Sequence, residues 1–442
     1  MLSSDAGNVR RIVSSADAQR EPGDVLILTD DRPSPADTVV YRAPNPGDLG
    51  KFIAGLYGNP ISAFDLLTTP WDMDGSSAIQ RQEVLDAIRS VSQQWGNSTI
   101  DGAHGIANLL ANAEYLLPAP RISKPLTDSP MVAVGAGPST SAMLDDLRTC
   151  GLPIIACDAA LGTLLKAGIR VDACTPLERL NSTWKKLPAN CGDTVFAGSP
   201  FAPPEAITPF TTRTFWPTCD PIFDWYEAPD SDFHPGTTTG TCAVATALRL
   251  TNGPVYLVGH DLCGGHMEGA TVSAELADEF DTQRMGYGGW LKPTKIAWLR
   301  AKYDLENMRT NRIINAAGYR GFGLRLDNIR CDELPQQPSV ILEWPTDMHP
   351  SRLIAFQLKA AHLQSDLQSA ALMAQSSSTL AECGLEHLAP PRNLDAIAYV
   401  LRPLYAQCSV MRRLGKTETN VVRIFRQAIE NIVHTVSEAL HG

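Results

Sequence analysis

Short apolar runs alternate with helix-length segments across residues 106–345, and this alternation constrains the fold more than any other feature of the chain. Strands that alternate with helices imply a mainly parallel sheet covered on both faces, which binds ligands at the carboxyl ends of its strands. We therefore predict an α/β core. The predicted strands are Met131–Val134, Pro153–Cys157, Val171–Thr175, Thr194–Ala197, Thr212–Phe215, Val255–Val258 and Arg312–Asn315. The predicted helices include Ala159–Ala167, Thr238–Leu250 and Thr294–Arg309.

Two flanking regions differ from this core. Residues 1–105 contain two strand patterns, Val25–Leu28 and Thr38–Arg42, and a helical pattern over Glu83–Gln94, which predicts a small α/β region. Residues 346–442 lack strand patterns and form a predicted helical domain, suited to partner docking or self-association. Its helices are expected after Ser351, over Asn393–Arg413 and from Thr417 onward, with a break at Ser376–Ser378. The last helix carries an apolar stripe of Val421, Phe425, Ala428, Ile432, Val436 and Leu440.

Charge and cysteine usage exclude several classes of function. The net charge is −11 and no long basic run occurs, which argues against nucleic acid or an anionic membrane as the main partner. No signal-peptide core and no apolar stretch of about 18 residues is present, so no membrane span is expected. The ten cysteines form no Cys-x-x-Cys pair, which indicates neither a zinc site nor a disulfide framework. These features predict a reduced, cytoplasmic protein.

A glycine-rich turn follows the first core strand. The turn is Gly135-Ala136-Gly137-Pro138, and Ser139 then stands where a helix would begin. A strand, a tight turn and a helix in this order are typical of a Rossmann-like fold, in which turn amides and the positive helix end face a bound phosphate. The alternative is that Gly137 only permits tight backbone packing. If the turn binds a phosphate, a valine at Gly137 would abolish ligand binding. If Gly137 only permits tight packing, the same valine would lower the stability of the protein instead.

Other polar residues follow the remaining strands. Asp158 ends the second strand and could cap a helix, accept from a ribose hydroxyl or bind a metal. Glu178 and Arg179 follow the third strand, where a surface ion pair is the simpler interpretation. Two further segments stand at strand or helix ends: Thr238-Thr239-Gly240 before a helix, and Gly259-His260-Asp261 with His266 after a strand. Because all of these positions fall at strand ends of one predicted sheet, we expect a shared site there.

The order of these segments resembles the motility-associated factor family of bacterial flagellin glycosyltransferases. The segments are GAGPS, CDAA, LLKAGIRVD, LER, the Gly/Thr turn, YLVGHDL and HMEG, and the resemblance spans roughly residues 106–330. The core is also similar to bacterial CMP-sialic acid transferases, which carry a Gly-x-Gly-Pro-Ser turn and an amide residue in place of Asp158. Related proteins include a group of pterin diphosphokinases, so the core alone leaves the substrate class open.

The resemblance implies transfer of a nonulosonic acid, of sialic, pseudaminic or legionaminic type, from a CMP donor to Ser or Thr hydroxyls of a protein, with flagellin as the expected acceptor. It implies no cofactor and assigns acceptor binding to the C-terminal helices. His266 is then the expected general base, with His260 as second choice and Asp261 shaping the floor of the site. The implied donor-binding residues are Gly135, Ala136, Gly137, Pro138, Ser139, Asp158, Ala159, Glu178, Thr238, Thr239, Gly240 and Gly259.

Two other functions remain open at this point. A pterin diphosphokinase would need magnesium, for which Asp158, Asp172 and Asp261 are available, although the sequence has no Gly-x-x-x-x-Gly-Lys loop. A nucleotide-binding adaptor would have no catalytic residues and would use the helical region to bind another protein.

Overall fold

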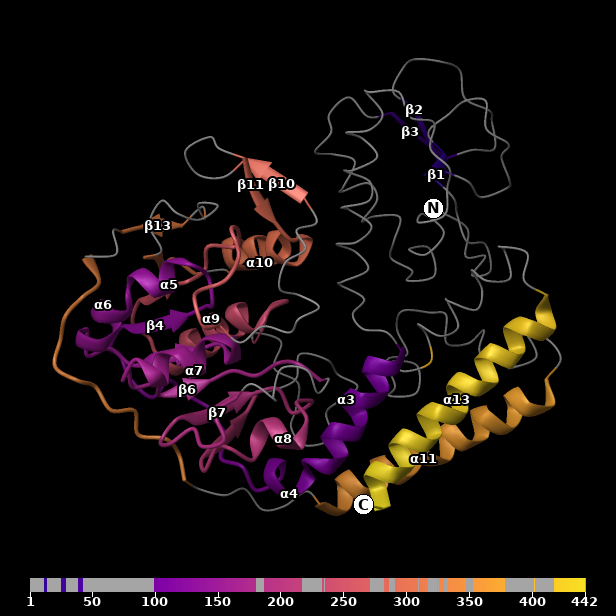
Figure 1. Cartoon of the computed structure of the whole chain (residues 1–442). Helices are drawn as coiled ribbons and strands as arrows, with labels where there is room; N and C mark the ends of the chain where they lie inside the picture. Colours follow the sequence, from indigo (N-terminus) through magenta and orange to yellow (C-terminus); the bar gives the residue numbers. More distant parts are fainter. Residues whose placement is uncertain are drawn as a thin grey trace. The chain divides into compact units, whose positions relative to one another are not determined.

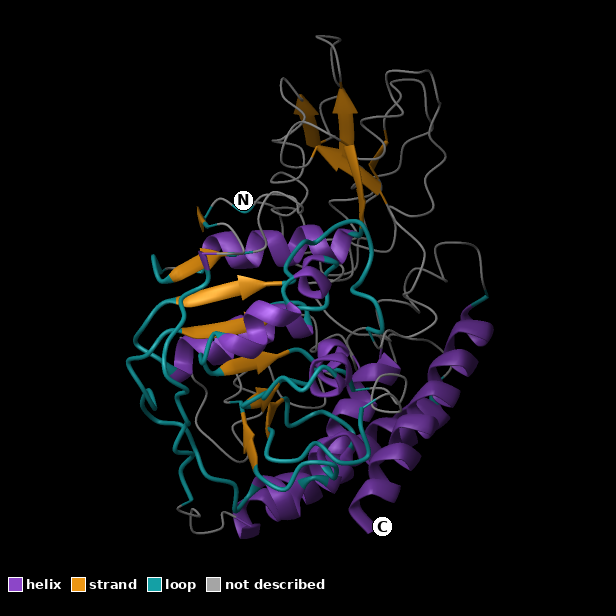
Figure 2. Ribbon diagram, turned by 60° about the vertical axis from the view of Figure 1, so that its left-hand side comes forward, coloured by secondary structure: helices purple, strands orange, loops and turns teal. Residues whose placement is uncertain are grey.

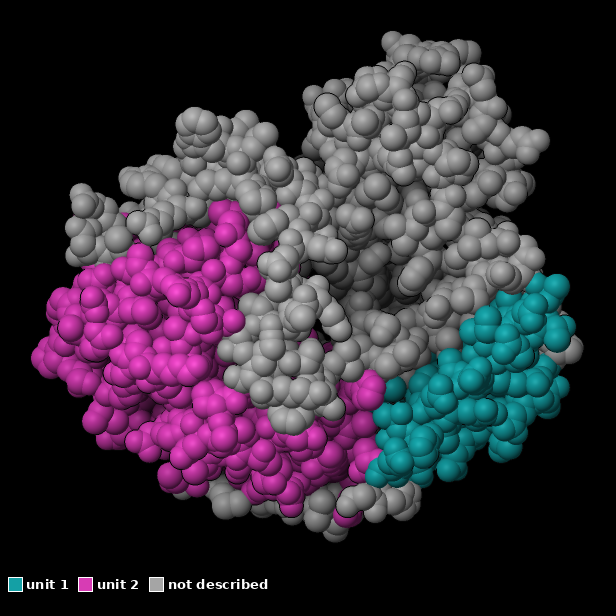
Figure 3. Space-filling model, viewed as in Figure 1, with its two compact units in different colours: residues 1–103, 361–438 teal, residues 104–360, 439–442 magenta. Residues whose placement is uncertain are grey.

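The computed structural model divides the chain into two compact units, residues 1–103 with 361–438 and residues 104–360 with 439–442 (Figure 3). The three-part division expected from the sequence stays a prediction. The residues that the structure describes are 12–13, 25–28, 39–42, 99–179, 187–216, 233, 235–270, 282–285, 291–308, 310–316, 324, 326–329, 333–346, 353–377, 401 and 417–441.

The larger unit is built on an eight-stranded sheet in which every pairing is parallel (Figure 2). The strand order is β13-β12-β9-β4-β5-β6-β7-β8. The strands are β4 (Met131–Val134), β5 (Ile154–Ala156), β6 (Ala173–Cys174), β7 (Val195–Gly198), β8 (Arg213–Phe215), β9 (Val255–Val258), β12 (Ile313–Asn315) and β13 (Asp327–Asn328). All residues of β4, β5, β6, β7 and β9 are buried, which is why these strands are continuous apolar runs. The predicted α/β class is confirmed.

The strand order places a topological switch point between β4 and β9. From β4 the chain adds strands in one direction as far as β8, then crosses back to β9 and adds β12 and β13 on the other side. The two strands are in register from Met131 opposite Val255 to Val134 opposite Val258, so they end at the same level. Ligands of such sheets bind in the crevice at this point.

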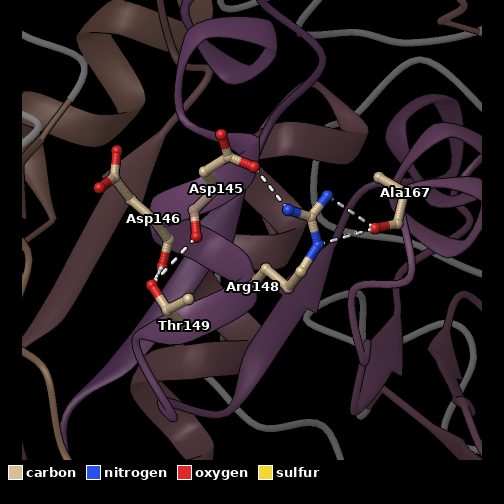
Figure 4. Close-up of polar contacts among 5 residues, drawn as sticks. All are labelled: Asp145, Asp146, Arg148, Thr149 and Ala167. Carbon is tan, nitrogen blue, oxygen red and sulfur yellow. Dashed lines mark hydrogen bonds and ion pairs between the residues drawn. The ribbon is translucent and has the colours of Figure 1, made fainter.

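Helices connect the strands of this unit (Figure 1). They are α3 (Thr99–Ala111), α4 (Ala113–Leu116), α5 (Ser139–Ala142), α6 (Leu144–Thr149), α7 (Asp158–Lys166), α8 (Pro204–Ile207), α9 (Thr239–Leu250) and α10 (Ile296–Asn307). The crossover helix α9 packs against β4, β5 and β9, and its small residues Ala243 and Ala247 allow a close approach to the sheet. The guanidinium of Arg148 on α6 donates to the carbonyl of Ala167 at 2.9 and 3.1 Å and so joins the ends of α6 and α7 (Figure 4).

Several elements of this unit were not predicted, among them the short edge strand β13 and a hairpin before α10. An antiparallel hairpin, β10 (Thr282–Met285) and β11 (Leu291–Thr294), precedes α10. The helix predicted over Thr294–Arg309 therefore begins later, at Ile296, because Thr294 is the last residue of β11. The prediction of a mainly parallel arrangement still holds, since the hairpin forms a separate two-stranded sheet.

The smaller unit contains a parallel three-stranded sheet and two long helices. The strands are β1 (Ile12–Val13), β2 (Val25–Leu28) and β3 (Val39–Arg42), of which β2 and β3 match the predicted pair. The predicted helix Glu83–Gln94 lies outside the described residues, as does Asn393–Arg413 apart from Leu401.

The long helices are α11 (Leu353–Ser376) and α13 (Glu418–His441). They run antiparallel: Gln364 is hydrogen-bonded to Ser437 near one end, and Arg426 donates to Ala374 near the other. Of the predicted stripe on α13, Val421, Phe425, Ile432 and Val436 are buried and Ala428 is half-buried, while the side chain of Leu440 lies outside the described residues. The helix α11 ends at the predicted serine break.

Candidate functional site

The glycine-rich turn after β4 joins the two strands of the switch point. The amide of Gly135 donates to Val258 O and the amide of Gly137 donates to Gly259 O, both at 2.8 Å. A Cβ atom at Gly137 would lie 2.3 Å from Asp261 Oδ2 and 2.5 Å from Gly259 O. The turn is therefore closed by the segment after β9, and Gly137 permits tight packing there.

Asp261 occupies the start of α5. Its Oδ2 atom accepts from the backbone amide of Ser139 at 2.9 Å and from Ser139 Oγ at 2.8 Å, and the residue is buried. A carboxylate of the protein thus holds the position that the sequence analysis gave to a donor phosphate. The amides of Gly137 and Ser139 are thus engaged within the protein, and Pro138 has no N–H group, while binding of the CMP phosphate or ribose by Ala136–Ser139 stays a prediction.

Asp158 follows β5, the strand that pairs with β4, and stands at the first position of α7. Its Oδ1 atom accepts from the amide of Ala159 at 2.7 Å, and its side chain also forms a hydrogen bond with Thr239. Burial raises the pKa of Asp158 from 3.8 to about 6, against the opposing effect of these hydrogen bonds. The carboxyl group therefore connects the amino ends of α7 and α9.

Replacing Asp158 with asparagine is expected to stabilise the larger unit at high pH. The folded state binds the proton of Asp158 more tightly than the unfolded state, so ionisation removes stability as the pH rises from about 4 through 6. The raised pKa corresponds to about 3 kcal/mol, and the amide of asparagine keeps an oxygen that can accept from Ala159. Thermal melts of variant and wild type should differ most at pH 8, and the difference should fall to about a third at pH 4.5. The exposed control Asp193→Asn should show no such trend; equal melts of Asp158→Asn and wild type at pH 8 would contradict the buried-charge argument.

The amino end of α9 lies beside Asp158. Thr238 caps the helix in a reciprocal arrangement with Thr241, and the helix predicted over Thr238–Leu250 begins one residue later, at Thr239. The carbonyl of Thr239 accepts from Thr175 Oγ1 at 3.2 Å, which ties the helix to the end of β6. Before the cap, Thr237 donates through its amide and hydroxyl to Asp304 Oδ2 of α10, at 3.1 and 2.9 Å. The helix end is thus fixed from three directions.

His260 follows β9 directly and is buried against this helix end. A Cβ atom at Gly240 would lie 3.3 Å from His260 Cε1. Burial lowers the pKa of His260 to about 4, although a hydrogen bond with the backbone of Ala133 opposes this shift. Its Nε2 atom has no hydrogen-bond partner among the described residues. His260 is therefore a neutral imidazole at pH 7 and a weak base.

His266 lies on a loop that is anchored at both ends. Thr294 Oγ1 donates to Leu262 O at 2.7 Å, and the amide of Met267 donates to Ala136 O at 2.8 Å. Between these anchors Gly264 and Gly265 have φ angles of 73° and 101°, and their Cβ positions face open space. The Met267 anchor fixes half-buried His266 next to the β4 turn, at the switch point. Its ring contacts that of Trp298 edge-on at a centroid distance of 5.3 Å.

Two predicted residues lie away from this cluster. Glu178 is exposed beyond the end of β6, whereas its neighbour Arg179 packs over the ring of Phe201. Asp172 precedes its strand, accepts from the amide of Ile154 at the start of β5 and pairs with Arg170. It therefore sits at the opposite, amino edge of the sheet and cannot join Asp158 and Asp261 around a magnesium ion. Within the described residues no group of three His, Cys, Asp or Glu side chains is placed to hold a metal.

Two asparagines that were not predicted from the sequence hold segments at the carboxyl edge of the sheet. On α3, Asn108 Nδ2 donates to the carbonyls of Arg179 and Phe201, and Asn112 Nδ2 donates to those of Pro200 and Ala202. They hold the segments that follow β6 and β7. The only sequence signal was two asparagines four residues apart on a helical face, a pattern without a specific meaning by itself.

Comparisons with known proteins agree with the resemblance stated from the sequence. Residues 107–266, less than half of the chain, match a family described as 6-hydroxymethylpterin diphosphokinase MptE-like. A solved structure of a Maf glycosyltransferase from Magnetospirillum magneticum AMB-1 is similar with a TM-score of 0.57 and 14% identity; the match covers 95% of this chain and 75% of that one. This likeness establishes a shared fold. No curated protein matches the sequence. None of the described helices combines the length and apolar character needed to cross a membrane.

Proposed function

We propose that this chain is a glycosyltransferase that moves a nonulosonic acid from a CMP donor to a Ser or Thr hydroxyl of a protein, with flagellin as the expected acceptor. The proposal rests chiefly on the position of His266: the hydrogen bond between Met267 and Ala136 holds this residue at the switch point of a parallel sheet. The fold shared with a Maf glycosyltransferase and the order of the sequence motifs support it.

The donor would bind at the amino end of α9. This twelve-residue helix presents the positive end of its dipole, and Thr239 and Gly240 lie there beside Asp158 and His260. Because the amides of Gly137 and Ser139 are engaged within the protein, α9 is the better phosphate site of the two predicted from the sequence. Buried His260, with its available Nε2 atom, would orient the donor by a hydrogen bond.

The reaction itself asks for one proton acceptor. The bond from the anomeric carbon to the CMP phosphate breaks, and its electron pair leaves with CMP, a good leaving group that needs no strong acid. The acceptor oxygen forms the new bond to that carbon, and its proton passes to a ring nitrogen of His266. Nearby carboxylates would stabilise the positive charge that develops on the sugar, and exclusion of water from the site would strengthen this effect. His260 is unsuited to the proton transfer because its pKa is about 4.

A diphosphokinase acting on a pterin-like alcohol is the second candidate, favoured by the family that residues 107–266 match. Magnesium in such a reaction is held by carboxylates and substrate phosphates. The position of Asp172 at the amino edge of the sheet leaves Asp158 and Asp261 at the carboxyl edge, and Asp261 is bound to Ser139. Of the three carboxylates expected for this reaction, Asp158 and Asp261 therefore remain at this edge, and Asp261 already accepts from Ser139.

A ligand screen separates the two functions. We expect CMP without magnesium to raise the melting temperature, because the fixed amides of α9 bind its phosphate directly; ligand at 100 times its Kd adds about 2.7 kcal/mol of stability. ATP with magnesium should give no comparable shift. The measurement is a thermal-shift series with CMP, CDP, ATP and GTP, each with and without magnesium. Stabilisation by magnesium ATP and none by CMP would replace the glycosyltransferase with the kinase.

A further inference from the structure

One ring nitrogen of His260 is a buried polar atom that has no hydrogen-bond partner within the described part of the chain. This atom is Nε2, and the residue as a whole is only 5% exposed. Buried polar groups in proteins nearly always have a partner, because an unpaired one lowers stability. An exception calls for a physical reason, and a group supplied by a bound ligand is one.

The other ring nitrogen determines what Nε2 can do. The hydrogen bond between His260 and the backbone of Ala133 raises the pKa of the histidine, as donation to a carbonyl oxygen does. Since Nε2 has no partner, the donor in this bond is the Nδ1–H group. Burial lowers the pKa of His260 to about 4, so the ring is neutral at pH 7 and carries this one proton only. Nε2 therefore holds a lone pair and can only accept a hydrogen bond.

This lone pair belongs to the amino end of α9. Nε2 is bonded to the ring atoms Cδ2 and Cε1. A Cβ atom at Gly135 would lie 3.5 Å from Cδ2, and one at Gly240 would lie 3.3 Å from Cε1. The ring edge that carries Nε2 thus faces the turn after β4 on one side and the first turn of α9 on the other. Both neighbours are glycines, and the second stands next to Thr239, which is hydrogen-bonded to Asp158.

The chemistry of a CMP donor shows which of its groups suits this atom. Its phosphate is ionised at pH 7 and offers only acceptor oxygens, which cannot pair with another acceptor. The nucleoside has two kinds of hydrogen-bond donor, the ribose hydroxyls and the amino group of cytosine. When the phosphate lies at the end of α9, the hydroxyls are only a few bonds away, whereas the amino group is at the far end of the base. Because Gly240 of this helix end adjoins the His260 ring, the hydroxyl is the better match.

We propose that His260 Nε2 accepts a hydrogen bond from a ribose hydroxyl of the donor nucleotide, so that the enzyme selects ribonucleotides over deoxyribonucleotides. This inference rests on the proposed function and names the part of the donor that His260 recognises. A site with a buried acceptor rejects an analogue that lacks the hydroxyl, because the acceptor then stays unpaired. His260 acts in this way on donor specificity and takes no part in proton transfer.

The test compares the binding of CMP, 2′-deoxy-CMP, 3′-deoxy-CMP and UMP by calorimetry. In the wild type we expect a Kd for CMP about 10–100-fold below that for one of the two deoxynucleotides, as for a buried acceptor left unpaired. In His260→Leu the two values should agree within about twofold, because the acceptor is gone. His434→Leu makes the same change at an exposed histidine of α13 and should keep the preference of the wild type.

A second measurement needs no variant and so does not depend on the folding of one. Nitrogen-15 NMR of the imidazole in the wild type should show protonated Nδ1 and unprotonated Nε2 at pH 7. Addition of CMP should shift the Nε2 signal as a new hydrogen bond does, and the discriminated deoxynucleotide should leave the signal in place. A protonated Nε2 in the free protein would contradict the inference.

Three binding results would also overturn it. The first is equal affinity of the wild type for CMP and both deoxynucleotides, and the second is a His260→Leu protein that still prefers the ribonucleotide as the wild type does. The third is a His260→Leu protein that loses only the preference for CMP over UMP, which would make the cytosine amino group the partner of Nε2. Failure of the proposed function itself looks different, because the wild type would then bind none of the cytidine nucleotides.

Discussion

Replacing His266 with alanine is expected to lower the rate of sugar transfer by about 10²–10⁴-fold, the usual effect of removing a general base. The base acts only when the acceptor hydroxyl attacks, so CMP affinity should stay close to that of the wild type. The loop should keep its position, because its anchors involve Thr294, Leu262, Met267 and Ala136 rather than the imidazole. Transfer rates and CMP titrations on the same protein preparations measure both effects. Part of the lost rate should return at high pH, where hydroxide replaces the base.

His260 provides the matched comparison for this experiment. It is buried and neutral at pH 7, so His260→Ala should weaken donor binding and lower stability rather than remove a base. If His260→Ala binds CMP normally but loses turnover, while His266→Ala keeps full turnover, then His260 is the base and His266 is not. Full turnover in both variants would exclude histidine base catalysis from the mechanism.

Replacing Gly137 with valine is expected to destabilise the larger unit by about 3 kcal/mol or more. Even the Cβ atom of valine meets Asp261 Oδ2 and Gly259 O at distances below any normal contact, and both atoms belong to buried, hydrogen-bonded groups. For a unit of this size the loss corresponds to a fall in melting temperature of roughly 6–12 °C. Melting followed by circular dichroism measures the effect.

Gly168→Ala is the control for this variant. Gly168 has a φ of 70° with no atom within 4 Å of its Cβ position, so alanine there carries only the cost of the left-handed backbone, about 1–2 kcal/mol. A Gly137→Val protein that melts like the wild type yet no longer binds CMP would restore the phosphate-cradle interpretation of this turn.

The sheet could be predicted from the sequence because its strands are buried on both faces. Met131–Val134 and Val255–Val258 are wholly apolar runs, and the structure places them at those residues. The start of α9 was equally visible, since Thr238 and Thr241 cap the helix through contacts three residues apart. Both features, a buried apolar strand and a helix cap, depend on residues that are close together in the sequence.

The contacts that decide the site are not local, and the sequence did not reveal them. Asp261 accepts a hydrogen bond from Ser139, which lies 122 residues earlier in the sequence. Because of this contact, the turn that the sequence suggested as a phosphate loop packs against the segment after β9. The edge-on contact between the rings of His266 and Trp298 was also not predicted, because it joins two segments that are far apart in the sequence. Asp172 is a different case: it comes before its strand rather than after it, so its place at the amino edge could have been predicted.

The position of β4 beside β9 also determines the order in which this protein can assemble. β4 to β8 precede β9 in the chain, so until β9 is synthesised β4 has one edge of unpaired N–H and C=O groups, and its side chains are all apolar. Such an edge is a template for association with other chains until its partner arrives. Pairings between distant segments form slowly because a long loop must close first. The switch point, with Asp261 and the histidines that follow β9, is therefore among the last parts of the sheet to form, so a folding intermediate that stops at β8 has neither a closed sheet nor a site.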